Sequence, residues 1–308
     1  MSGDGAMKHE NFSMEKDGFA GHLAEPDCGS SRAVVIIMGG EQSLLPGIKF
    51  AERFADHGIT GLAVSLFGAD GLPASPDRIP LDMFIPASEY LRNVKKIKHI
   101  SVYGQSMGSI FAELCAEKIG GFEKLIMVSP THVPFEGSCP DKKTMTGHSV
   151  AVWQGRELPF VKANLSKVNA IRYYRHPAVK YKVTGMWSAY YEAYRNRAAE
   201  KAELSIEKCD ADILLIAGAM DECWDAAYSV KKLAARLKNG SFARKVKTVI
   251  YPHGSHLSGL MPNRQREKKL YRMIPVVGFM YRSFGKYRRE NMKYFENSEK
   301  EIIAWIKG

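Results

Sequence analysis

Short stretches of uninterrupted apolar residues recur along the chain, and the first clear example is Ala33-Val-Val-Ile-Ile-Met38. A strand that is apolar on both faces is typical of a parallel sheet with helices packed on either side, whereas a strand with one wet face alternates. Similar runs predict further strands at residues 60–65, 99–103, 124–129, 213–217 and 247–251, and an early strand is expected at 19–24.

Several segments between these strands have apolar positions at helical spacing. They predict helices at residues 48–57, 81–94, 109–119, 226–237 and 290–306. A regular succession of strand and helix indicates an α/β protein whose central sheet is mostly parallel and carries helices on both faces.

Two stretches interrupt this alternation. Residues 131–205 have few clean strand patterns and many aromatic side chains, and we expect them to form an inserted cap with a helix around 187–204. Residues 263–290 form a basic excursion after the last strand. The pattern otherwise predicts a single domain over residues 1–308.

The composition is that of a soluble globular protein, with 45% hydrophobic and 25% charged residues. The polar stretch Met1–Met14 has no signal-peptide core, and the apolar runs are far shorter than the roughly 20 residues of a membrane span, so stable membrane insertion is not expected. The five cysteines are scattered without a CxxC pair, which argues against a zinc site or a disulfide framework. We therefore expect a cytoplasmic protein with reduced thiols.

The formal net charge is +11, and much of the excess lies near the C-terminus. Its basic residues there are Arg264, Arg266, Lys268, Lys269, Arg272, Arg282, Lys286, Arg288, Arg289 and Lys293. Such a stretch forms either a solvated basic face or lid, or a surface that attracts an anionic substrate or anionic lipid. Nucleic acid is not an expected partner, because no zinc finger, helix-turn-helix or RNA-binding signature accompanies the charge.

The strongest chemical signal is Gly104-Gln-Ser106-Met-Gly108, which has the form GxSxG between a predicted strand and a predicted helix. The turn between them is tight, so the two glycines leave room and the serine projects from the carboxyl end of the strand in strained backbone. Its hydroxyl then lies near a helix N-terminus, which favours developing negative charge. This context favours Ser106 as a nucleophile over an unrelated glycine-rich turn.

A serine nucleophile needs a base, and the base needs an orienting acid. In the α/β-hydrolase fold these follow in the order Ser, Asp or Glu, His. Asp221 lies four residues after the strand predicted at 213–217, the expected place for the acid, and this offset favours it over its neighbours Glu222 and Asp225. The alternative role for Asp221 is that of a helix N-cap. His256 follows the last strand and is preferred to His253, because Gly254 and Ser255 give the loop slack to return the imidazole toward Ser106.

An oxyanion hole would complete the site. The backbone N–H of Met107 is one expected donor, and the N–H of Glu41, in the loop after residues 33–38, is the other. Gly39 and Gly40 would let the backbone approach a substrate closely, although two glycines at this place are equally typical of an ordinary turn at the end of a strand. No metal and no organic cofactor is implied, because the triad supplies nucleophile, base and oxyanion stabilisation.

Four parts of the chain carry a family resemblance: Gly71–Pro73 with Ile79–Phe84, Val102–Gly108, Ser129-Pro130 with Val152–Gly155 and Leu158-Pro159, and Gly218–Trp224 with Tyr251–His256. Together they resemble the C-terminal catalytic domain shared by acyl-CoA thioesterases and bile acid-CoA:amino acid N-acyltransferases, in its bacterial form. The resemblance covers about residues 30–306, with 163–205 and 263–290 poorly matched. It implies Ser106, Asp221 and His256 as the triad.

The resemblance also implies a small-molecule acyl ester or acyl-CoA thioester as substrate. Mammalian-type members carry a β-sandwich domain before the hydrolase domain, and these 308 residues leave no room for one. The loop Gly39–Leu44 also lacks the further glycines that often follow the double glycine in the family. Both departures bear on substrate identity. Some members of the family have a cysteine nucleophile. In this family a serine nucleophile favours hydrolysis over amino-acid conjugation.

We therefore expect a serine acyl hydrolase that works through an acyl-enzyme intermediate, most similar to an acyl-CoA thioesterase. The alternatives are a carboxylesterase, an acyltransferase that passes the acyl group to an amine or alcohol, a peptidase of the same fold, and a non-catalytic binding protein on a hydrolase scaffold. The sequence makes no prediction of oligomeric state.

Overall fold

The computed structural model describes residues 7–40, 43–140, 144–162, 197–239, 242–257 and 281–308, together with positions 259, 272, 276 and 278. Its main feature is an 8-stranded sheet with the order β1-β2-β4-β3-β6-β7-β12-β13. The strands are β1 (Met7–Phe12), β2 (Gly21–Pro26), β3 (Arg32–Ile37), β4 (Thr60–Val64), β6 (His99–Gln105), β7 (Lys124–Val128), β12 (Asp212–Gly218) and β13 (Val246–Tyr251). Strands β4 to β13 of this order are parallel, and β1 and β2 form an antiparallel edge.

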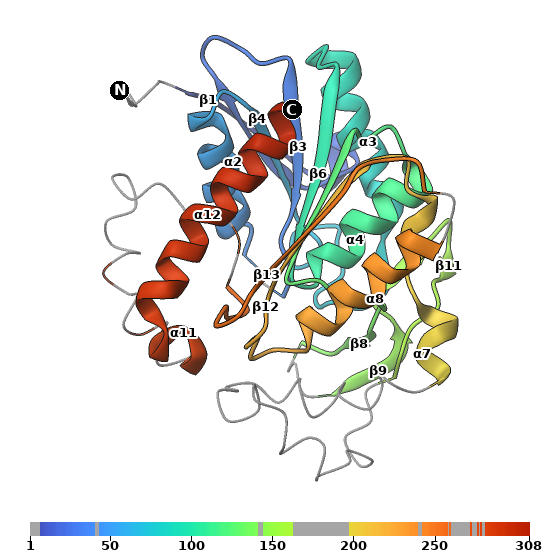
Figure 1. The fold of residues 1–308 in the computed structure, drawn as a ribbon. Helices are drawn as coiled ribbons and strands as arrows, with labels where there is room; N and C mark the ends of the chain where they lie inside the picture. Colours follow the sequence, from blue (N-terminus) through green and yellow to red (C-terminus); the bar gives the residue numbers. More distant parts are fainter. Residues whose placement is uncertain are drawn as a thin grey trace.

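Helices cover both faces of the sheet (Figure 1). On one face lie α2 (Leu45–Asp56) and α12 (Arg288–Lys307), and on the other α3 (Phe84–Glu89), α4 (Gly108–Leu114) and α8 (Ala226–Asn239). The apolar strands divide between the two cores by alternation, since Val34 and Ile36 pack with α2 and α12 while Val35 and Ile37 pack with α4 and α8. The predicted α/β class with a mostly parallel sheet is confirmed.

Strand β1 and the helix predicted at 81–94 both differ from the sequence prediction. Strand β1 was not expected, because MKHENF is polar on the face that an edge strand leaves to water. The helix predicted at 81–94 is a 3₁₀ turn at Leu81–Met83, then α3, then a π-helical turn at Tyr90–Val94. Pro86 lacks an N–H and fits only the first turn of an α-helix, which accounts for the start of α3 at Phe84.

The predicted cap, residues 131–205, is described only in part. Its described residues form β8 (Glu136–Ser138), β9 (Met145–Ser149), β10 (Ala151–Trp153), β11 (Arg156–Glu157) and α7 (Arg197–Ala202), and β10 pairs with β5 (Ile79–Pro80). These strands have two to five residues, too few for alternation to be recognised in the sequence. Residues 163–196, with most of the helix predicted at 187–204, lie outside the described residues.

The C-terminal part returns to the sheet. The basic stretch 263–290 is largely outside the described residues, and its described end contains α11 (Arg282–Lys286). Helix α12 then packs along the sheet (Figure 1), where Arg32 donates to the carbonyl of Ile306 at 3.0 Å and Arg53 pairs with Glu299 at 2.5 Å. Over the described parts of the chain, no helix is both long and apolar enough to cross a membrane.

Candidate active site

Ser106 occupies the turn between β6 and α4 with φ of 58°, in the left-handed region that a side chain rarely adopts. Its N–H donates to the carbonyl of Val128 at 2.9 Å, and the side chain is half-buried. The flanking glycines are required by space, because a Cβ at Gly104 would lie 2.6 Å from the Cβ of Ala112 and one at Gly108 would lie 2.6 Å from the carbonyl carbon of Ile37. The turn therefore has the strained geometry of a nucleophile elbow.

Three residues that are far apart in the sequence form one hydrogen-bonded chain. The Ser106 hydroxyl lies 2.8 Å from Nε2 of His256, and Nδ1 of His256 lies 2.8 Å from Oδ2 of Asp221. Asp221 and His256 are almost completely buried, with exposed fractions of 2% and 5%. The imidazole can thus donate to the carboxylate through Nδ1 and accept the serine proton at Nε2.

The loops that carry the acid and the histidine are locked together. The second oxygen of Asp221, Oδ1, accepts hydrogen bonds from the backbone N–H groups of Cys223 at 2.8 Å and Trp224 at 3.1 Å. The N–H of Met220 donates to the carbonyl of Gly254 at 2.9 Å, and a Cβ at Gly218 would lie 2.5 Å from the carbonyl oxygen of Ser255. The relative position of Asp221 and His256 is therefore fixed by backbone contacts.

The environment of His256 changes its basicity. Burial lowers the pKa of the imidazole, but the charge of Asp221, the neighbouring Cys223 and the hydrogen bonds to both outweigh it and hold the pKa well above the usual 6.5. The cationic form that would appear when His256 accepts a proton is thus stabilised mainly by Asp221.

The rival histidine lies elsewhere. His253 donates through Nδ1 to Glu290 at 2.6 Å, and its ring stacks on Tyr287 with centroids 4.1 Å apart. Both of these partners belong to the C-terminal segment and not to the elbow.

The loop after β3 borders the elbow, as expected for an oxyanion hole. A Cβ at Gly39 would lie 2.7 Å from Cα of Met107, and closer still to the nitrogen of the same residue. Only a glycine leaves space beside that N–H. Glu41, the second expected donor, lies outside the described residues.

Two contacts to His256 were missed by the sequence analysis. The ring of Trp224 meets the imidazole edge to face, with centroids 4.8 Å apart and planes at 83°, and its Nε1 donates to the carbonyl of Ser129 at 3.1 Å. The Ser129 hydroxyl in turn donates to the carbonyl of His256 at 2.7 Å. Ser129 follows β7 directly, and this position at a strand end, together with the family resemblance of Ser129-Pro130, was the available signal.

Glu222 was considered only as a rival acid, but it has a different position. Its side chain is fully buried and accepts hydrogen bonds from the backbone N–H groups of His256 at 3.0 Å, Ser283 at 3.0 Å and Phe284 at 3.3 Å, as well as from the Ser283 hydroxyl. Burial raises the pKa of this carboxyl despite these donors. Glu222 thus connects the histidine loop to α11.

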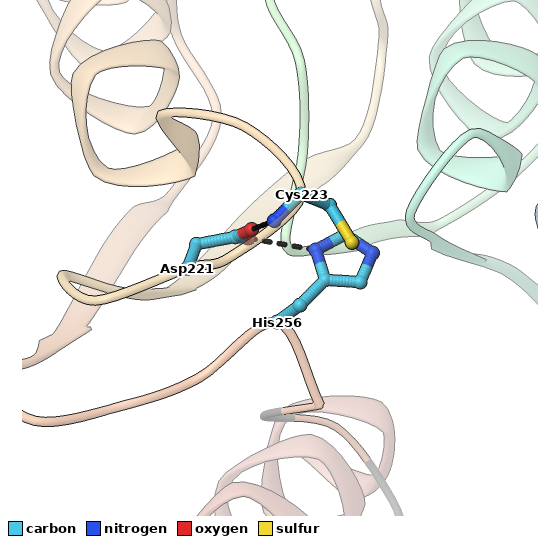
Figure 2. A group of neighbouring side chains, drawn as sticks. All are labelled: Asp221, Cys223 and His256. Atoms are coloured by element: carbon cyan, nitrogen blue, oxygen red, sulfur yellow. Dashed lines mark hydrogen bonds and ion pairs between the residues drawn. The ribbon is translucent and has the colours of Figure 1, made fainter. Parts of the chain in front are cut away.

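A thiol completes the surroundings of the triad. In Figure 2, the side chain of Cys223 turns toward the imidazole of His256, beside Asp221. The three residues offer a sulfur, a nitrogen and an oxygen that all lie within 4.8 Å of one another. Within the described part of the chain they are the group suited to hold a metal ion.

The mostly parallel sheet, the elbow at the end of β6 and the loops after β12 and β13 that carry Asp221 and His256 have the arrangement of the α/β-hydrolase fold. Residues 79–261 match the family described as BAAT / acyl-CoA thioester hydrolase C terminal. This match spans more than half of the 308 residues, and the chain belongs to that family.

Solved structures agree on the fold. A protein from Klebsiella pneumoniae described as a dienelactone hydrolase is 11% identical, with a TM-score of 0.54 over 98% of this chain and 99% of that one. An α/β hydrolase from a Medee basin deep-sea metagenome library is 14% identical, with a TM-score of 0.50 over 94% of this chain and 98% of its own.

The acylaminoacyl peptidase of Pyrococcus horikoshii is also similar, at 14% identity and a TM-score of 0.50 over 90% of this chain. This chain spans only 41% of the length of that peptidase. No curated protein sequence matches the chain. At these identities the likeness to solved structures shows the fold alone.

Proposed function

We propose that the protein is a serine acyl hydrolase similar to acyl-CoA thioesterases, with Ser106 as nucleophile, His256 as base and Asp221 as orienting acid. The observation that carries this proposal is the unbroken chain of hydrogen bonds from Ser106 through His256 to Asp221, with 2.8 Å at each step. The strained backbone of Ser106 supports it, because strain of this kind persists where the surrounding structure imposes it and is frequent at catalytic sites.

The reaction follows from the geometry. Ser106 attacks the acyl carbon while its proton passes to Nε2 of His256, and Asp221 stabilises the imidazolium. The N–H of Met107 and, in our proposal, that of Glu41 donate to the oxyanion. His256 then protonates the leaving thiol or alcohol, and the same imidazole activates the water that releases the acid and frees Ser106.

We further propose that the 308 residues act as one α/β-hydrolase domain with a cap over about 131–205, and that the protein works in the cytoplasm. All five cysteines are free thiols, as is usual in a reducing compartment. The basic residues of 263–290 are candidates for attracting the phosphates of coenzyme A.

The experiment compares short- and long-chain acyl-CoA with p-nitrophenyl esters of the same chain length, using Ser106→Ala as the control. We expect the thioesters to be turned over with higher kcat/KM and the variant to lose activity while keeping its melting temperature. Turnover of the simple esters alone would make the protein a carboxylesterase. Transfer to an added amine or alcohol in place of water would make it an acyltransferase.

A further inference from the structure

Cys223 has a position that the hydrolytic mechanism does not use. Its backbone N–H holds Asp221, but its thiol lies beside the imidazole of His256 (Figure 2). The sulfur, one imidazole nitrogen and one carboxylate oxygen lie within 4.8 Å of one another. The exposed fractions of Asp221, Cys223 and His256 are 2%, 6% and 5%, so these ligand atoms are largely shielded from bulk water.

These three groups are the side-chain types that bind zinc. Zn–S bonds are about 2.3 Å and Zn–N and Zn–O bonds about 2.0–2.2 Å, which places tetrahedral ligands about 3.3–3.7 Å apart. A separation of at most 4.8 Å therefore requires side-chain shifts of only about 1 Å to close around an ion. Imidazole and thiolate together select zinc-like ions over magnesium or calcium, which prefer oxygen.

Access and a fourth ligand are both available. Ser106 is half-buried, so the triad can be reached from its side, and its hydroxyl lies 2.8 Å from Nε2 of His256. A water that enters from this side can fill the fourth position of a tetrahedral ion. The ring of Trp224 packs against the imidazole and limits how far His256 can move away.

We propose that Asp221, Cys223 and His256 form an inhibitory site for Zn²⁺ and similar thiophilic divalent ions. On binding, the Cys223 thiol releases its proton to solvent and the thiolate coordinates the ion, while His256 gives a nitrogen lone pair to the metal. With one ring nitrogen bound to the ion and the other carrying the ring proton, the imidazole is unable to accept the proton of Ser106, so hydrolysis stops until the ion is removed. This inference goes beyond the proposed function, because the site would bind metal whatever the substrate.

The first test measures inhibition. Zn²⁺ is titrated against p-nitrophenyl ester hydrolysis by the wild type, Cys223→Ala and Cys223→Ser, each relative to its own uninhibited rate, and EDTA is then added. We expect reversible inhibition of the wild type and a rise of at least about tenfold in the half-inhibitory concentration for both variants. Cys139→Ala, which removes a half-buried thiol outside the triad loops, is the matched control and should behave as the wild type.

The second test needs no activity. Co²⁺ added to the wild type and to Ser106→Ala should give a thiolate-to-cobalt charge-transfer band at one ion per chain, and Cys223→Ala should lack it. Absence of the band in the wild type, or its persistence in Cys223→Ala, would overturn the proposal, as would equal zinc inhibition of wild type and both Cys223 variants. An enzyme inactive on every ester would contradict the proposed function but would leave the cobalt result decisive for this site.

Discussion

Ser106 is held in a backbone conformation that costs on the order of 1–3 kcal/mol, and its neighbours impose it. Its N–H is bonded to Val128, and Gly104 and Gly108 let β6 and α4 approach closely around it. Adding side chains at these glycines would force the strand and the helix apart. The strain at Ser106 is thus sustained by packing that extends well beyond the serine itself.

Gly39 packs directly against the elbow, so a methyl group added there should disturb the backbone around Met107 and lower both activity and stability. In Gly39→Ala the new Cβ would meet the nitrogen of Met107. We expect kcat to fall by about 10²–10³, the usual effect of losing one oxyanion donor, with a smaller change in KM. The measurement is steady-state kinetics on a p-nitrophenyl ester beside a thermal melt.

The neighbouring glycine is the matched control for this variant. A Cβ at Gly40 would meet nothing within 4 Å, although its φ of 72° makes alanine strained. Gly40→Ala should therefore lose some stability but retain most of its kcat. If both variants lose kcat equally, the space beside Met107 is not the cause.

The acid limb of the pH profile should report His256. In the proposed mechanism the neutral imidazole accepts the serine proton, and the folded protein holds the pKa of His256 above its usual 6.5, chiefly because Asp221 outweighs the effect of burial. In the presence of EDTA, kcat/KM of the free enzyme should fall as the pH drops through a midpoint above 6.5. Asp221→Asn removes the charge, so its residual activity should have a midpoint at lower pH, and an unchanged midpoint would show that another group controls the limb.

At the scale of elements, the loop after β12 connects three parts of the molecule. Asp221 contacts His256 from the loop after β13, Trp224 packs on the same imidazole, and Glu222 accepts from the backbone N–H groups of both His256 and Ser283 in α11. The position of the C-terminal segment and the position of His256 therefore depend on the same few residues.

Glu222→Ala should weaken this connection. The change leaves the buried N–H groups of His256 and Ser283 without their acceptor, and each such loss costs about 1–3 kcal/mol. We expect a clearly lower melting temperature together with a lower kcat, measured by thermal unfolding and ester hydrolysis.

Glu290→Ala is the comparison, because it removes an exposed carboxylate of α12 that pairs with His253. Water screens a pair of exposed charges and leaves it with little effect on stability, so this variant should remain close to the wild type. Equal effects of the two substitutions would mean that Glu222 has no special role in positioning His256.

Some elements and contacts could be predicted from the sequence and others could not, and the difference has physical causes. Strands β3 and β6 were predictable because both faces are buried, and Ser106 because GxSxG marks a turn with strict space requirements. The contact of Glu222 with Ser283 joins positions 61 residues apart, and no local pattern encodes it. The thiol of Cys223 was likewise unremarkable in the sequence, because its proximity to His256 arises only when the two loops meet.

For the whole molecule, the order of the sheet determines the site. Strands β6, β7, β12 and β13 are neighbours and parallel, so their carboxyl ends place Ser106, Ser129, Asp221 and His256 at one edge. The alternation of strands and helices predicted a parallel sheet, but the spatial order follows from long-range packing. The antiparallel pair β1–β2 at the far edge could not be read from the polar sequence of β1.

The charge of the whole chain gives a prediction about substrate encounter. With a net charge of +11, the protein should attract a polyanionic acyl-CoA more than an uncharged ester. Salt shortens the Debye length from about 10 Å at 0.1 M to about 3 Å at 1 M. Between these concentrations kcat/KM should fall several-fold for acyl-CoA and stay nearly constant for a p-nitrophenyl ester, and parallel salt curves would contradict attraction by the positive net charge.

The central claim is that Ser106 is a nucleophile activated by His256, and covalent labelling tests it most directly. The intact protein is treated with a fluorophosphonate probe, its mass is measured, and the modified peptide is sequenced. We predict one adduct per chain on Ser106, none in Ser106→Ala, and much slower labelling in His256→Ala. An adduct on another residue, or labelling of Ser106→Ala at the wild-type rate, would contradict the account.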